Sequence, residues 1–238
     1  ILVKAIAARV LDLAVDDPAA MLSGRLLANE GIVGAVEADF FDWPLLAEGG
    51  DDLVRQLAGE TARFRLRDVE VDVLKSLYES LIDPDERHDL GEYYTPDWLA
   101  ARVVAAAIPR PLEQRVLDPS CGSGTFLFHA VRRLIEAGRE AGLHPAAIVA
   151  ACADHVFGID VHPVAVALAR VTWLLALGDL VQDRPPTLSV PVFMGDSMQW
   201  SLRPLGASAE VLVDVPPNDP PLRIPAGLAS DLDLFERA

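Results

Sequence analysis

Three aspartates, Asp118, Asp160 and Asp196, each follow a short apolar run of the kind that forms a buried strand. The first opens the segment Asp-Pro-Ser-Cys-Gly-Ser-Gly-Thr-Phe over 118–126, a turn with two glycines that leads into a helix. Glycines let backbone amides approach a ligand, and the helix N-terminus adds partial positive charge. The turn has no lysine, and a carboxylate at the strand end would repel a pyrophosphate. The segment therefore favours a ligand with a positive amino group, such as S-adenosylmethionine.

Residues 118–126 resemble motif I of the adenine-N6 DNA methyltransferases, particularly the modification subunits and fused enzymes of restriction systems. Three further segments resemble motifs of that family and stand in the family's order. They are Gly-Glu-Tyr-Tyr-Thr-Pro over 91–96, Phe-Gly-Ile-Asp-Val-His-Pro over 157–163 and Met-Gly-Asp-Ser over 194–197. The set spans under half of the chain, but it is far more specific than one glycine turn.

The resemblance implies S-adenosylmethionine as the cofactor and gives each motif a role in holding it. Asp118 would lie near the methionine amino group, Asp160 would accept from both ribose hydroxyls, and Asp196 would accept from the adenine amino group. Val161 would pack on the adenine ring. The residues assigned to the cofactor in this way are Tyr93, Tyr94, Thr95, Asp118, Pro119, Ser120, Cys121, Gly122, Ser123, Gly124, Thr125, Phe126, Asp160, Val161, Asp196 and Ser197.

Each motif also has an ordinary structural interpretation. The glycine turn and Asp160 could only cap helices, Val161 could belong to the core, and Gly-Asp-Ser is a common turn. The tyrosine pair could be a packing contact before a helix. A dinucleotide site is disfavoured, because Asp160 follows Gly124 by 36 residues, well beyond the ~20 of the dinucleotide fingerprint. The chain also lacks a Gly-x-Gly-x-x-Gly.

Methyltransferases of this family also carry a catalytic Asn-Pro-Pro-Tyr or Asp-Pro-Pro-Tyr, which holds the amino group of an adenine swung out of the duplex. This tetrapeptide does not occur in the sequence. The nearest candidate is Val-Pro-Pro-Asn over 215–218, which makes Asp214, Pro216 and Pro217 weak catalytic candidates. We expect this segment to be a proline-rich connection and the catalytic motif to lie beyond Ala238. The chain alone would then bind the cofactor and transfer nothing.

The elements that would position these motifs follow from the apolar patterns. Residues 1–82 are predicted to form an N-terminal helical domain, because their apolar positions recur at spacings of three and four. From residue 96 short apolar runs alternate with helical patterns. Helices are predicted over 96–108, 125–141, 145–153 and 163–178, and strands over 115–117, 156–159 and 190–194. A further candidate strand covers 210–213.

This alternation predicts an α/β fold, a doubly wound parallel sheet with helices on both faces. The resemblance makes it a Rossmann-like methyltransferase core over 90–238, incomplete at its C-terminus. Ligands of such sheets bind at the carboxyl ends of the strands. The three aspartates would meet there.

Composition limits the partners. The net charge of −16 and the pI near 4.6 argue against this chain alone gripping duplex DNA, which requires clustered Lys and Arg. In the intact protein DNA would be contacted by regions outside this chain, and a specificity or nuclease subunit or domain is a candidate partner. The chain starts without methionine, as an excised fragment of a longer protein would.

Location and metal content are also constrained. Cys121 and Cys152 are far apart, and no histidine pairs with another ligand at metal spacing, so we expect a reduced cytoplasm and no metal. The apolar run 163–181 contains Arg170 and Asp179, which favours a packed helix over a membrane span.

The sequence therefore predicts the cofactor-binding part of an adenine-N6 DNA methyltransferase from a restriction-modification or phage-defence system. Two alternatives stay open. One is a methyltransferase that acts on RNA or protein, and the other is a non-catalytic module that uses the same fold for binding or assembly.

Overall fold

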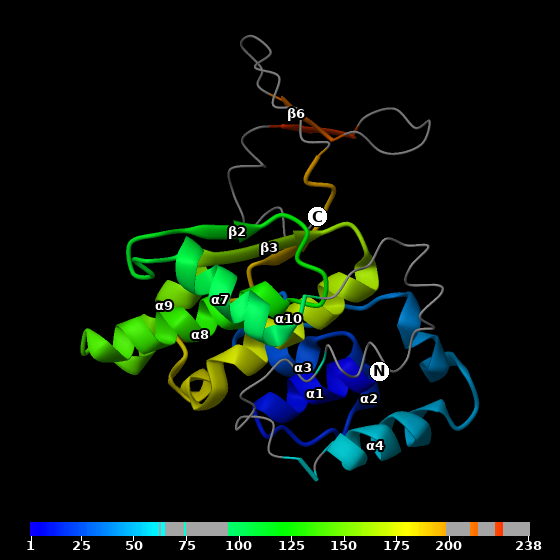
Figure 1. Cartoon of the computed structure of the whole chain (residues 1–238). Coiled ribbons are helices and arrows are strands. Elements are labelled where there is room, and N and C mark those ends of the chain that lie inside the picture. Colours follow the sequence, from blue (N-terminus) through cyan, green and yellow to red (C-terminus); the bar gives the residue numbers. More distant parts are fainter. Residues whose placement is uncertain (62, 65–73, 75–94, 199–209, 214–221, 226–238) are drawn as a thin grey trace. The chain divides into compact units, whose positions relative to one another are not determined.

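The structure of the chain is a computed structural model that describes residues 1–61, 63–64, 74, 95–198, 210–213 and 222–225 (Figure 1). Residues 1–195 form one unit and residues 196–238 a second. The predicted boundary between the N-terminal domain over 1–82 and the core from residue 90 lies outside the described residues.

A three-stranded parallel sheet carries the motif segments. Its strand order is β2-β3-β5, and the register pairs Asp118 with Gly158 and Asp160 with Met194. The connecting segments contain the helices α8, α9 and α10. The bounds are β2 Val116–Asp118, β3 Val156–Asp160, β5 Val192–Met194, α7 Asp97–Ala107, α8 Thr125–Glu140, α9 Pro145–His155 and α10 Pro163–Leu177. The predicted helices and strands of this region are confirmed to within two residues at each bound.

Both crossovers run in the same direction across the sheet, from β2 to β3 and from β3 to β5. Because such crossovers are right-handed, their helices fall on one face. Figure 1 shows α8 and α10 side by side beneath the strands. The opposite face holds a shallow apolar groove of about 410 Å³, lined by Arg115, Val116, Leu117, Phe157, Ile159 and Phe193. The chain therefore has an α/β fold with a parallel sheet.

Helix α10 is the central core helix. Eleven of its residues are buried, among them Trp173, whose indole N–H donates to the Val156 carbonyl at 3.3 Å. Pro163–Asp183 is long and apolar enough to cross a membrane, yet 78% of its most apolar window is buried inside the protein. This burial is what a core helix shows.

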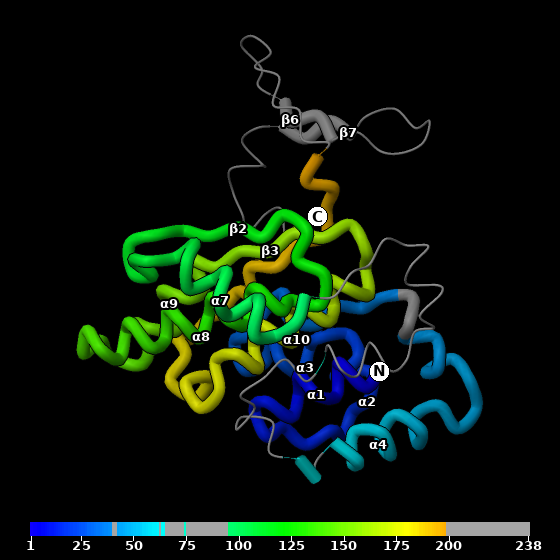
Figure 2. The backbone as a smooth tube through the Cα atoms, in the orientation of Figure 1, coloured from blue at the N-terminus to red at the C-terminus, as the bar shows by residue number. Residues whose placement is uncertain are grey.

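The N-terminal region packs against the other side of α10. Its elements are α1 Leu2–Val10, α2 Pro18–Leu22, α3 Arg25–Ala28, β1 Ile32–Val33, the 3₁₀ helix η1 Phe40–Leu46 and α4 Gly50–Thr61. In Figures 1 and 2 the blue α1 lies beside α10, and the two helices are in contact. Ile6, Val10 and Ile32 share one hydrophobic core with α8 and α10.

The N-terminal region, predicted to be helical, also contains one short strand. Ile32 and Val33 form the short strand β1, which pairs in parallel with β4, Leu188–Ser189. A two-residue strand has no alternating pattern that a sequence could display. Its pairing depends on a partner far along the chain.

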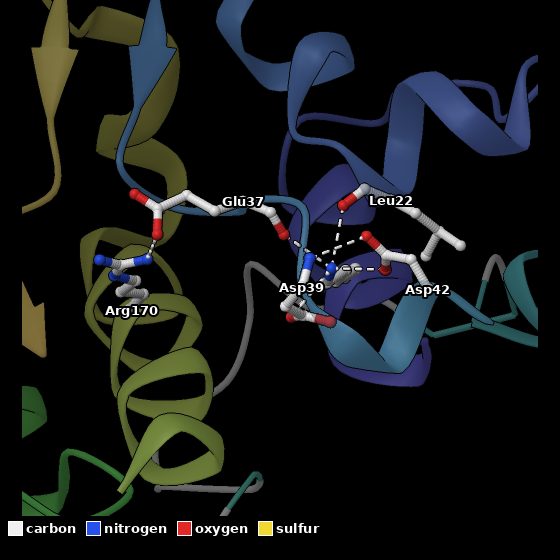
Figure 3. A network of polar contacts seen from close by, with 6 residues as sticks. Leu22, Glu37, Asp39, Asp42 and Arg170 are labelled. Carbon is white, nitrogen blue, oxygen red and sulfur yellow. Dashed lines mark hydrogen bonds and ion pairs between the residues drawn. The ribbon is translucent and has the colours of Figure 1, made fainter. Parts of the chain in front are cut away.

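Lys4 connects the segments of the N-terminal region (Figure 3). Its side chain is only 7% exposed. The ammonium group donates to the Leu22 carbonyl at 3.0 Å and the Glu37 carbonyl at 2.7 Å, and it pairs with Asp42 at 2.7 Å and Asp39 at 3.0 Å. Four partners satisfy a charge that would otherwise be costly to bury.

Arg170 connects the same network to the sheet. Its Nη1 lies 2.5 Å from a carboxylate oxygen of Glu37 (Figure 3). Its Nε donates to the Val192 carbonyl at 2.9 Å. The cation that interrupts the apolar run of α10 is therefore satisfied by β5 and by the N-terminal region.

The second unit contains an antiparallel pair of strands, β6 Glu210–Val213 and β7 Leu222–Pro225. The strand predicted over 210–213 is confirmed, but its partner is β7 in antiparallel register. Asp214, Pro216 and Pro217 lie outside the described residues.

Candidate functional site

Two acidic side chains meet at the carboxyl edge of the sheet. Asp118 is the last residue of β2, and Asp160 is the last residue of the adjacent strand β3. Both are half-buried, and the charge of Asp160 contributes to raising the pKa of Asp118. The parallel strands thus bring these two predicted side chains together.

The glycine turn after β2 is fastened to the end of β3. The Cys121 N–H donates to the Ile159 carbonyl at 2.9 Å, and the Gly122 N–H donates to Oδ2 of Asp160 at 2.8 Å. The turn ends at Gly124, a left-handed residue from which α8 begins. The backbone of the turn therefore curves around the strand ends, with its amides directed at carbonyl and carboxylate oxygens.

The two glycines of the turn have different requirements. Gly122 has a φ of +53°, and a Cβ added there would meet nothing within 4 Å. Gly124 has a φ of +94°, and its added Cβ would lie 3.0 Å from Cα of Ala169 and 3.2 Å from Cβ of Thr172. Gly122 thus faces open space, whereas Gly124 lets α8 and α10 pack closely.

Alanine at these two glycines should separate the two roles. Gly124→Ala is expected to lower the free energy of unfolding by about 2 to 4 kcal/mol, because it combines a left-handed alanine with crowding against α10. Gly122→Ala should cost only about 1 kcal/mol, from the left-handed backbone alone. Urea unfolding followed by circular dichroism measures both variants. Equal losses in the two variants would contradict the conclusion that Gly124, and not Gly122, lies at the packing contact with α10.

Asp118 has a buried carboxylate oxygen that could accept a hydrogen bond from a positively charged ligand. One oxygen accepts from the Ser120 N–H at 3.2 Å, whereas Oδ2 is buried and finds no hydrogen-bond partner within the described residues. Burial raises the pKa of this carboxyl, the Ser120 N–H opposes the rise, and Asp160 adds to it. A buried acceptor without a partner is costly, and an ammonium group placed there would remove the cost.

Asp160 is hydrogen-bonded through both carboxylate oxygens. Oδ1 accepts from the His162 N–H at 2.9 Å, and Oδ2 accepts from Gly122 as described. A carboxylate has about four acceptor positions, so two remain for hydroxyl groups. Val161, the next residue, is 70% exposed, which contradicts the alternative that it belongs to the core.

The other residues of the predicted motif I face different surroundings. Pro119 and Ser120 are exposed and Phe126 is half-buried against the core, while the side chains of Cys121, Ser123 and Thr125 are buried. Burial, with Asp118 and Asp160 nearby, raises the pKa of the Cys121 thiol far above its usual range. These three buried residues can reach a ligand only through their backbone.

The structure leaves untested the predicted roles of Tyr93, Tyr94, Thr95, Asp196 and Ser197. Tyr93 and Tyr94 lie outside the described residues. Thr95 is half-buried just before α7. Asp196 and Ser197 begin the second unit, where Oδ1 of Asp196 accepts from the Met198 N–H at 2.9 Å.

Sequence reasoning missed two contacts that position these elements. Nε2 of His129 lies 2.9 Å from Oδ1 of Asp97, which fastens the start of α7 to α8. Gly158 lies under α8, where an added Cβ would be 2.6 Å from Cδ1 of Leu127. Neither contact has a local sequence signal. The first pair is separated by 32 residues, and a single glycine in a strand does not stand out.

Among the described residues, no group of three or more His, Cys, Asp or Glu side chains could hold a metal ion. What the site offers instead is a buried unpaired carboxylate oxygen, a second carboxylate with spare acceptor positions, and an open glycine turn.

The profile of the family described as N-6 DNA Methylase matches residues 69–194, more than half of the chain. A curated relative, the "Adenine-specific methyltransferase PglX" of Streptomyces coelicolor (strain ATCC BAA-471 / A3(2) / M145), is 32% identical over 151 residues. The match covers 60% of this chain and 11% of the relative, so the chain spans a small part of that protein's length. No solved structure matches the chain.

Proposed function

Because this chain belongs to the N-6 DNA methylase family, we propose that it is the cofactor-binding part of a methyltransferase that acts on adenine N6 in DNA. The observation that carries the proposal is the buried, unpaired Oδ2 of Asp118 beside the open glycine turn. The relative's name as an adenine-specific methyltransferase supports adenine as the target. A restriction-modification or phage-defence system is the proposed setting, and the cytoplasm the proposed location.

The proposal includes a doubly wound sheet. Three parallel strands in the order β2-β3-β5, with same-direction crossovers, correspond to one half of such a fold. The other half would continue beyond β2, which is an edge strand among the described residues. Asp118 would then lie at the switch point, where ligands of doubly wound sheets bind. The apolar groove on the opposite face supports this arrangement, because the helices of the second half would cover it.

The raised pKa and unpaired oxygen of Asp118 and the open space at Gly122 support S-adenosylmethionine as the cofactor. Asp118 would hold the methionine ammonium group, and Gly122 would let the ligand pass close to the backbone. Asp160 would accept from the ribose hydroxyls through its two spare acceptor positions, and the exposed Val161 would pack on the adenine ring. Asp196 would accept from the adenine amino group, and Tyr93, Tyr94 and Thr95 would close the methionine end.

The cofactor supplies a methyl group on a cationic sulfur, so the donor is already activated. The tasks left to the protein are to position donor and acceptor and to hold the target amino group. The described residues would position the donor. DNA would be the partner that brings the acceptor, through surfaces outside this acidic chain. A specificity or nuclease subunit or domain is a further proposed partner.

A calorimetric titration of S-adenosylmethionine into the chain tests the cofactor part of the proposal. Saturable binding with one site is expected. A folded chain that binds neither S-adenosylmethionine nor S-adenosylhomocysteine would contradict the proposal.

The absence of an Asn-Pro-Pro-Tyr predicts no methyl transfer by the chain alone. The assay incubates adenine-containing DNA with S-adenosylmethionine labelled in the methyl group. Detectable N6-methyladenine would show that residues 214–218 act as the catalytic loop after all.

Lowering the pH should weaken the binding of S-adenosylmethionine. The raised pKa of Asp118 means that the cofactor-free protein takes up this proton at a pH above the ordinary value of 3.8. The neutral acid attracts an ammonium group less, so affinity should fall as the pH drops through the raised pKa. The sign for stability is opposite: between 3.8 and the raised pKa the folded state binds more protons than the unfolded state, so this residue's contribution to stability falls as the pH rises.

Calorimetry at a series of pH values from the ordinary value of 3.8 up to neutral measures this dependence. Asp118→Asn is the matched control, because it keeps the shape of the side chain and cannot titrate. The variant should bind more weakly and lose this part of the pH dependence. The same slope in both proteins would assign the titration to another group.

A further inference from the structure

Asp160 touches three segments of the site at once. Its Oδ2 accepts from Gly122 in the glycine turn at 2.8 Å, and its Oδ1 accepts from His162 at the start of α10 at 2.9 Å. Its backbone carbonyl accepts from Gly195, the residue after β5, at 2.9 Å. The side chain makes two of these contacts, and the backbone carbonyl makes the third.

The glycine turn needs such a contact at Gly122. A Cβ added there would find open space within 4 Å, so side-chain packing does not confine this part of the turn. Glycine also has the widest choice of backbone conformations. The left-handed conformation at Gly122 is therefore held by neighbouring hydrogen bonds, of which the one to the Asp160 carboxylate is charge-assisted.

We propose that Asp160 is a positioning residue that fixes the glycine turn before the cofactor arrives, in addition to its proposed contact with the ribose. The second role rests on the proposed function, whereas the first does not. The carboxylate can carry both, because the two backbone N–H groups use about half of its acceptor positions. A turn that is already in place saves the ordering cost that binding would otherwise include.

The first test follows individual backbone amides by hydrogen exchange in the cofactor-free protein, measured by nuclear magnetic resonance. In Asp160→Ala the amides of Gly122 and His162 should exchange at least about tenfold faster, which equals about 1.4 kcal/mol. The amide of Cys121 is an internal reference, because it donates to the Ile159 carbonyl, which the substitution leaves in place. It should change by less than about threefold.

The matched control is Asp179→Ala, which removes one exposed carboxylate from the same unit. It should leave all three amides unchanged. Unchanged exchange at Gly122 in Asp160→Ala would overturn the proposal, and so would equal acceleration of Gly122 and Cys121, which would indicate general loosening. Should Asp160→Ala fail to fold, the wild-type protein still decides: a Gly122 amide that exchanges as fast as in an unstructured peptide overturns the proposal.

The second test separates positioning from the ribose contact. S-Adenosylhomocysteine and its 2′,3′-dideoxy analogue are titrated into the wild-type protein and Asp160→Ala. A residue that only binds the ribose would make no difference to the analogue. A positioning residue should weaken the analogue as well, by about threefold or more.

Equal affinity of the two proteins for the analogue would limit Asp160 to the ribose contact and overturn the positioning role in binding. Failure of the wild-type protein to bind either ligand would overturn the proposed function, while the exchange experiment would still decide whether Asp160 holds the turn.

Discussion

Replacing Asp160 by alanine is expected to weaken the binding of S-adenosylmethionine by tenfold or more, which corresponds to at least about 1.4 kcal/mol. The substitution removes the proposed acceptor for the ribose hydroxyls. It also removes the acceptors of the Gly122 and His162 N–H groups. The loss therefore combines a missing ligand contact with a less ordered turn.

Calorimetry of the wild-type protein and the variant at one pH measures this effect. Asp179→Ala controls for the loss of one negative charge, because its side chain is exposed. It should bind as the wild-type protein does. An affinity that Asp160→Ala leaves unchanged would refute the site.

Replacing Lys4 by methionine should lower the free energy of unfolding by about 3 kcal/mol. Methionine keeps most of the length of the side chain and removes the charge. The carboxylates of Asp39 and Asp42, which are 33% and 18% exposed, would then lose the Lys4 ammonium group as a partner. The Leu22 carbonyl, to which the ammonium group donates within the buried part of the network, would lose its donor.

The comparison is with Arg55→Met, which breaks an ion pair at the surface. Arg55 is 46% exposed and its partner Asp52 is 88% exposed, so that loss should stay below about 1 kcal/mol. Urea unfolding followed by circular dichroism measures both variants. A Lys4→Met loss no larger than that of Arg55→Met would mean that the buried network contributes nothing to stability.

Local signals were sufficient to predict the helices α7 to α10 and the strands β2, β3 and β5, but not the two-residue strand β4. Pro145 and Pro163 are the first residues of α9 and α10, where proline is well tolerated, and Gly124 precedes α8. Short apolar runs gave the strands. Because parallel strands end at one edge of a sheet, the meeting of Asp118 and Asp160 could be predicted as well.

Contacts between distant segments could not be predicted in this way. Lys4 looks in the sequence like a polar interruption of an apolar helix, and its partners lie up to 38 residues away. Arg170 was correctly expected in a packed helix, but its partner Glu37 is separated from it by 133 residues. Nothing local distinguishes such a pair from two surface charges.

In the site, too, the sequence indicated which residues are involved but not the contacts that they make. The resemblance identified both glycines of the turn, but only the packing shows that Gly122 faces open space while Gly124 lies against α10. It assigned Asp160 to a ligand, and the hydrogen bonds to Gly122 and His162 became visible only in three dimensions. The roles of all the assigned residues in holding the cofactor stay predictions.

The pairing of β1 with β4 has a consequence for synthesis on the ribosome. Val33 cannot form its strand pairing until its partner Ser189 has been translated. At elongation rates of about 5 to 20 residues per second, this delay lasts roughly 8 to 30 seconds. The Lys4 network needs only residues 4–42 and can form early, but Ile32 has no strand to pair with until then. The apolar contacts of the N-terminal region with the later part of the chain therefore stay unformed for many seconds during synthesis.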